Sequence, residues 1–102
     1  MDRFHRLPRA SVLGFEVPVA TTWSARLLGL AMLDRDLAPA GLLIPSCRAV
    51  HTLGMRFELD LVFLDRDERV VELRRSLRPA RFARCGAAAS VLELSVPPLP
   101  GT

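Results

Sequence analysis

A chain of 102 residues, half of them apolar, is long enough for one domain with a hydrophobic core. The charged fraction of 25% is ordinary for a globular protein and excludes a disordered or collagen-like chain. The net charge is +3, but the 14 basic residues, all arginine, are interleaved with 11 acidic residues and aromatic residues are scarce, so nucleic-acid binding is not indicated.

The two ends of the chain differ from its middle. Residues 1–10 are basic and contain no apolar stretch typical of an export signal, which predicts a flexible tail and a cytoplasmic protein. Residues 11–96 are expected to form the domain, and the Pro-rich residues 97–102 a tail that cannot continue a β-ladder. No apolar stretch is long enough to span a membrane. Two cysteines make no disulfide framework, so Cys47 and Cys85 are expected to be free thiols.

The first predicted elements are a strand and a short helix. Loose alternation of apolar residues over Ser11–Val19 predicts one strand. Thr21 or Thr22 can cap a helix, because a threonine hydroxyl accepts from a free amide of the first turn. Trp23 and Leu27 then share one helical face, which predicts that Trp23 belongs to the core, with a platform for a ligand as the alternative.

The remaining pattern is dominated by strands. Two alternating runs joined by a polar turn predict a β-hairpin. With the early helix, these segments predict an α+β fold, mainly β, with a small curved sheet or partial β-barrel. In chain order we expect a loop at Asp34–Ala40, a strand at Gly41–Ile44, the hairpin strands Phe57–Asp65 and Arg69–Leu77, a loop at Arg78–Gly86 and a last strand at Ser90–Val96.

Three blocks of the chain follow a recognisable family pattern. They are A-T-T with a later R-L-L-G-L over Ala20–Leu30, followed by G-L-L at Gly41–Leu43; V-H-T-L-G-M-R-F-E-L-D-L-V-F-L-D over Val50–Asp65; and V-L-E-L at Val91–Leu94. The central block is the most specific. In this order the blocks resemble the uncharacterised bacterial and archaeal DUF192 family. The resemblance implies a fold and no reaction.

One spacing in the central region has the chemistry of a metal site. Cys47, His51 and Met55 are four residues apart and would share one face of a strand or a helix. A thiol, an imidazole and a thioether form a soft ligand set of the kind that Cu(I) accepts, although the spacing matches no standard zinc signature. The preferred interpretation is that Cys47 and Met55 belong to the core and that His51 bonds to the backbone.

A carboxylate in the middle of a predicted strand is the second unusual feature. Asp60 lies between Leu59 and Leu61, where an unpaired carboxylate is costly. We therefore expect Asp60 to be buried and hydrogen-bonded to His51, Arg56, Thr52 or a backbone amide. The alternative is a catalytic set in which Cys47 is the nucleophile, His51 the base and Asp60 its orienting partner.

The arginines after the hairpin are a further candidate surface. We expect them to be solvated, with an anionic partner as the alternative, and one of them to pair with Glu93 in the last apolar strand. They are Arg74, Arg75, Arg78, Arg81 and Arg84.

These features favour a non-enzymatic binding module with a groove beside His51–Asp60 and no cofactor. The candidate ligand contacts are Thr52, Met55, Arg56 and Trp23, and the expected partner is a protein or a small anionic ligand. The alternative is a small enzyme or a soft-metal-handling protein that uses Cys47, His51 and Asp60.

Overall fold

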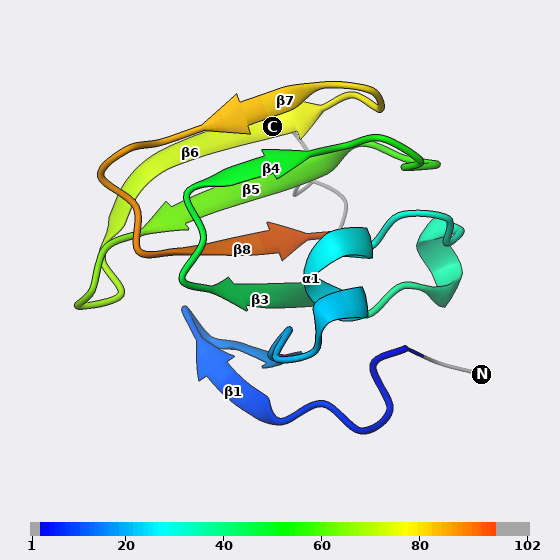
Figure 1. Ribbon diagram of the computed structural model, residues 1–102, viewed down its shortest axis with the longest axis horizontal. Helices are drawn as coiled ribbons and strands as arrows, with labels where there is room; N and C mark the ends of the chain where they lie inside the picture. Colours follow the sequence, from blue (N-terminus) through cyan, green and yellow to red (C-terminus); the bar gives the residue numbers. More distant parts are fainter. Residues whose placement is uncertain (1–2, 96–102) are drawn as a thin grey trace.

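The main sheet has four antiparallel strands. The computed structural model describes residues 3–95, and Figure 1 shows the arrangement of their elements. The short strand β8 is internal, between β3 and β5, so its side chains face the core on both sides. The strands in sheet order are β3 (Gly41–Pro45), β8 (Ser90–Leu94), β5 (Leu59–Leu64) and β6 (Val70–Leu77).

Two further sheets have two strands each, and one short helix covers part of the core. Within residues 3–95 the three sheets do not close into a barrel, and the fold is α+β and mainly β, as predicted. The elements are β1 (Arg9–Val12) with β2 (Phe15–Pro18), β4 (Ala49–His51) with β7 (Phe82–Arg84), the helix α1 (Trp23–Leu28) and a 3₁₀ turn, η1 (Arg35–Leu37).

Strand β5 is buried on both faces, and this divides the core into two. Leu61 and Phe63 lie in the larger cluster, with residues of α1, β4 and β7. Val62 and Leu64 lie in the smaller cluster, with Val12 and other residues of the β1–β2 hairpin. Each face of the main sheet is therefore covered by a different part of the chain, which explains the nearly continuous apolar run of β5.

Several elements agree with the sequence pattern. The expected hairpin is confirmed, because β5 pairs with β6 antiparallel. Thr22 is the helix cap, and its hydroxyl accepts from the amide of Ala25 at 3.2 Å. Gly29 ends the helix with a φ of 53°, a conformation that favours glycine. The last strand also forms, as β8, although Val96 and the predicted tail 97–102 lie outside the described residues.

The N-terminal part of the chain differs from its prediction. The expected single strand Ser11–Val19 is a hairpin instead, because Leu13 and Gly14 adopt φ values of 51° and 84° and reverse the chain. The predicted tail is packed on the domain in its described part, since Phe4 and Leu7 are both buried in the larger cluster. These two residues hold the segment on the domain, because burying their apolar side chains removes apolar surface from water.

The loop predicted at Arg78–Gly86 contains the strand β7. This strand has only three residues and pairs with β4, with Ala49 opposite Arg84 and His51 opposite Phe82. Only the middle residue, Ala83, is buried. A three-residue strand with one buried small side chain leaves no clear alternation in the sequence, so it was missed.

Candidate functional site

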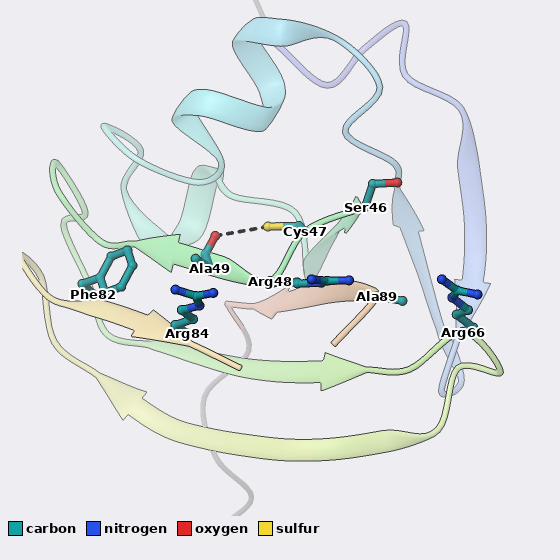
Figure 2. A pocket seen from close by; sticks show the side chains of 8 residues that line it. All are labelled: Ser46, Cys47, Arg48, Ala49, Arg66, Phe82, Arg84 and Ala89. Atoms are coloured by element: carbon teal, nitrogen blue, oxygen red, sulfur yellow. Dashed lines mark hydrogen bonds between the residues drawn. The ribbon is translucent and has the colours of Figure 1, made fainter. Parts of the chain in front are cut away.

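A hollow beside the β4–β7 pair carries three arginines. It has a volume of about 670 Å³, and its walls include Arg48, Arg66, Arg84, Phe82 and Cys47 (Figure 2). We call it the arginine hollow. Phe82 is 67% exposed and offers an aromatic surface at one end of it.

Three separate segments bring these arginines together. Arg84 lies on β7, and Arg48 lies just before β4. The two are held near each other because the amide of Cys85 donates to the carbonyl of Arg48 at 2.8 Å. Arg66 comes from the turn between β5 and β6 and lies across the hollow from Arg84 (Figure 2). The hollow therefore depends on the tertiary fold.

The charges of these arginines are not neutralised by neighbouring acids. Within residues 3–95, the ion pairs are those of Arg56 with Asp34 and of Arg74 with Glu72, so the arginines of the hollow have no carboxylate partner. Arg48 donates from Nε to the carbonyl of Ala88 at 3.2 Å, which fixes the side chain and leaves its terminal nitrogens unbonded. Three cationic groups that line one hollow, each without an ion pair in the part of the chain that the structure describes, favour a positive potential there.

A second, much smaller cavity of about 50 Å³ adjoins the arginine hollow. Cys47 and Ala49 line both of them. We call it the Glu93 slot, because the carboxyl of Glu93 lies in its wall together with Arg26 and His51. Glu93 belongs to the internal strand β8 and is 3% exposed.

The carboxyl of Glu93 is held in an unfavourable environment. Its Oε1 has no hydrogen-bond partner in the structure. Burial raises the pKa of Glu93 from 4.5 to about 7, and a hydrogen bond with the backbone of Leu30 partly opposes this rise. A buried polar atom without a partner costs free energy and is characteristic of a site with another role.

Helix α1 and its cap residue Gly29 form the wall of the slot that faces Glu93. A side-chain carbon added at Gly29 would lie 2.8 Å from Oε1 of Glu93, so any larger residue at this position would require the carboxyl to move. Arg26 donates to the carbonyls of Pro45 and Ser46, which fastens the helix to the segment before β4. Its guanidinium is thus bonded to carbonyls and not to Glu93. The expected pairing of Glu93 with one of the arginines after the hairpin is not formed either, because within residues 3–95 the ion pairs are Arg56–Asp34 and Arg74–Glu72.

The structure brings two of the three proposed catalytic residues to the slot. Cys47 and His51 both line it, and the Cys47 thiol donates to the carbonyl of Ala49 at 3.1 Å. Asp60 lies elsewhere: it is half-buried, and its Oδ1 accepts from the amide of Ser76 at 2.8 Å. The predicted backbone partner of Asp60 is confirmed, whereas the set of Cys47, His51 and Asp60 is not assembled.

The predicted ligand contacts need correction. Thr52 is fully buried, and its hydroxyl accepts from the amide of Arg81 at 2.7 Å and donates to a nearby carbonyl, so it holds the 78–81 segment in place. Met55 is buried in the larger cluster. Arg56 is exposed and pairs with Asp34 at 3.2 Å. Trp23, predicted in the core, is 78% exposed, because the short helix packs through Ala25 instead.

The soft-metal set is not assembled either. Met55 is a core residue and lines neither the arginine hollow nor the Glu93 slot, whereas Cys47 lines both. Among residues 3–95, no three His, Cys, Asp or Glu side chains lie close enough together to hold a metal ion. Cys47 and Cys85 are free thiols.

The arginine hollow is lined by residues on either side of the predicted His51–Asp60 segment, from Ser46–Ala49 before it to Arg66, Phe82 and Arg84 after it. Of the segment His51–Asp60, His51 lines the Glu93 slot, and the other residues line neither the slot nor the arginine hollow. Arg48, Arg66 and Glu93 were not among the predicted site residues. Glu93 could have been found from the sequence, because it is a carboxylate within an apolar strand, as Asp60 is. Arg48 and Arg66 could not, because each is a single arginine in an irregular segment and carries no local signal.

The fold and the two cavities define a small, mainly β domain with a basic hollow beside a buried carboxyl. The sequence model of DUF192, described as "Uncharacterized ACR", matches residues 6–96. The chain belongs to the DUF192 family. No curated protein matches it at a significant level.

One solved structure has a similar fold. It is a protein of unknown function from Novosphingobium aromaticivorans DSM 12444, with a TM-score of 0.62 and 19% sequence identity. The match covers 78% of this chain and 62% of the other, so the chain spans less than two thirds of the length of that protein. At this identity the likeness concerns the fold alone. None of the helices within residues 3–95 has the length and apolar character needed to cross a membrane.

Proposed function

We propose that this domain is a non-enzymatic binding module that holds a small anionic ligand in the arginine hollow. The observation that supports the proposal is that Arg48, Arg66 and Arg84 line one hollow and have no carboxylate partner among residues 3–95. Guanidinium groups bind phosphate and carboxylate through paired, charge-assisted hydrogen bonds. A phosphate dianion suits three cationic groups better than a single carboxylate does.

The size and shape of the hollow favour a small molecule. Its volume of about 670 Å³ lies within the usual range of ligand pockets. The exposed face of Phe82 can cover an apolar or cyclic part of the ligand. The same positive potential would attract an anion from solution and increase its association rate.

The alternative of an enzyme or a soft-metal-handling protein has weaker support. It required Cys47, His51 and Asp60 or Met55 to converge, and the latter two residues lie elsewhere. The free, half-buried thiols of Cys47 and Cys85 are in keeping with a reducing compartment, and we propose a cytoplasmic location.

Replacement of one arginine tests the proposal. Calorimetric titration of the protein with inorganic phosphate should give saturable binding, and Arg84→Gln should weaken it roughly five- to tenfold, because one charge-assisted contact is lost. The matched control is Arg75→Gln, which removes the same charge from an exposed position on β6 outside the hollow. Equal weakening by both variants would show that only net charge matters, and would contradict a site in the hollow.

A further inference from the structure

The Glu93 slot has the features of a polar subsite that is separate from the arginines. Its carboxyl comes from an internal strand, is 3% exposed and has one oxygen without a partner. The structure leaves space at this point, because Gly29 lacks a side chain that would meet the carboxyl oxygens at 2.8 and 3.3 Å. The cavity of about 50 Å³ is large enough for one or two non-hydrogen atoms.

The surrounding residues restrict what can enter the slot. Leu27, Leu28 and Ile44 give it apolar walls, in which an isolated charge is poorly solvated. An ammonium group is disfavoured by charge repulsion, because the Arg26 guanidinium lines the same slot and three more arginines line the adjoining hollow. A carboxylate would meet the carboxyl of Glu93 itself. A neutral polar group therefore fits the slot best.

A hydroxyl is the neutral group that suits this carboxyl in both of its protonation states. The pKa of Glu93, raised to about 7, means that the protonated and ionised forms are both present near neutral pH. A hydroxyl donates to the ionised form and accepts from the protonated form, since it has one donor and two acceptor positions. An ether can only accept, so it serves the protonated form alone, and an amide N–H can only donate, so it leaves the O–H of the protonated form without an acceptor.

We propose that the Glu93 slot receives a hydroxyl group of the same ligand whose anionic group occupies the arginine hollow, so that the ligand class is the phosphorylated polyols, which includes sugar phosphates. The inference rests on the proposed function. Its geometric basis is that Cys47 and Ala49 line both cavities, which places the slot directly beside the arginine hollow, within reach of a second group of one small ligand. The arginines supply most of the affinity, and Glu93 supplies selectivity for hydroxylated ligands.

A pair of matched ligands tests this selectivity. Glycerol 3-phosphate and propyl phosphate have the same phosphate group and carbon chain and differ in two hydroxyls. Calorimetric titration should show at least roughly tenfold tighter binding of glycerol 3-phosphate, because the polar slot rejects a ligand that leaves its carboxyl without a partner. Glu93→Leu should remove this difference, and Glu93→Gln, which keeps a carbonyl acceptor, should retain part of it.

The possible outcomes separate the two proposals. Arg84→Gln should weaken both ligands by the same factor and leave their ratio unchanged. If the wild type binds both phosphates equally, or if Glu93→Leu keeps the preference, the slot proposal is wrong while the arginine hollow stands. If neither phosphate binds to the wild type, the proposed function fails and the slot proposal fails with it. Amide NMR spectra of each variant establish that it is folded.

Discussion

At the scale of single residues, the buried carboxyl of Glu93 lowers the stability of the folded domain, because it occupies a place in the core that an apolar side chain could fill. A buried carboxyl could be replaced by an apolar or neutral side chain of similar volume with little loss or even a gain in stability. Its retention beside Gly29, which gives it room, is most simply explained by a polar ligand group at this point. The same charge makes the stability of the folded domain depend on pH.

The direction of this pH dependence follows from the raised pKa. The folded state holds the Glu93 proton up to about pH 7, whereas the unfolded chain releases it near 4.5, so the stabilising contribution is complete below pH 4.5 and is lost as the pH rises to about 7. A change of this size corresponds to roughly 3 kcal/mol. In urea unfolding at pH 5 and pH 7.5, the wild type should lose about 2 kcal/mol more stability across this interval than Glu93→Gln, because part of the titration lies below pH 5.

An exposed carboxylate provides the control for the pH measurement. Glu58→Gln removes a carboxylate that is exposed and lies outside both cavities, so its pH profile should follow that of the wild type. The account of Glu93 would be refuted by equal pH dependence in the wild type and Glu93→Gln.

At the scale of elements, Asp60 has a structural role in the main hairpin. The pairing of β5 with β6 is interrupted between Leu59 and Leu61, where β6 contains one extra residue and Ser76 adopts a φ of 53°. The amide of Ser76 does not continue the ladder and donates to Asp60 instead. The carboxylate therefore stabilises a β-bulge, which explains why a charged residue is tolerated in an otherwise buried strand.

Substitution of Asp60 should separate this role from that of a catalytic residue. Asp60→Ala removes the acceptor of the Ser76 amide and should cost about 1 kcal/mol in urea unfolding, because the bond is partly exposed and water can replace it. Asp60→Asn keeps a carbonyl oxygen at this position and should cost less than half as much. An equal loss in both variants would show that the negative charge, and not the acceptor at the bulge, is what matters.

Sequence patterns predicted long elements better than short ones. The sequence predicts the β5–β6 hairpin and β8, because the burial of several residues in each strand produces a regular apolar pattern. The turn at Leu13–Gly14 was missed because a leucine with positive φ is uncommon. Trp23 was misplaced because a six-residue helix buries so little of its surface that the apolar face is not fixed by pattern alone.

At the scale of the whole molecule, the Glu93 slot is formed where the three blocks that carry the family resemblance meet. The first block supplies Arg26 and Gly29, the second His51 and the third Glu93, all in the wall of one slot. These residues are far apart in the chain, and they are carried by α1 with its cap, by β4 and by β8 (Figure 1). The arginine hollow could not be predicted from local sequence, because Arg48 and Arg84 are brought near each other by the pairing of β4 with β7, and Arg66 reaches the hollow from the turn between β5 and β6.

The central claim is that the arginine hollow binds an anion, and amide NMR during a titration with inorganic phosphate tests it most directly. We predict saturable shifts confined to the walls of the hollow, at Arg48, Ala49, Arg66 and Arg84, with no change in the β1–β2 hairpin on the other face of the sheet. Shifts that do not saturate, or that are spread over all exposed arginines including Arg75, would contradict the claim.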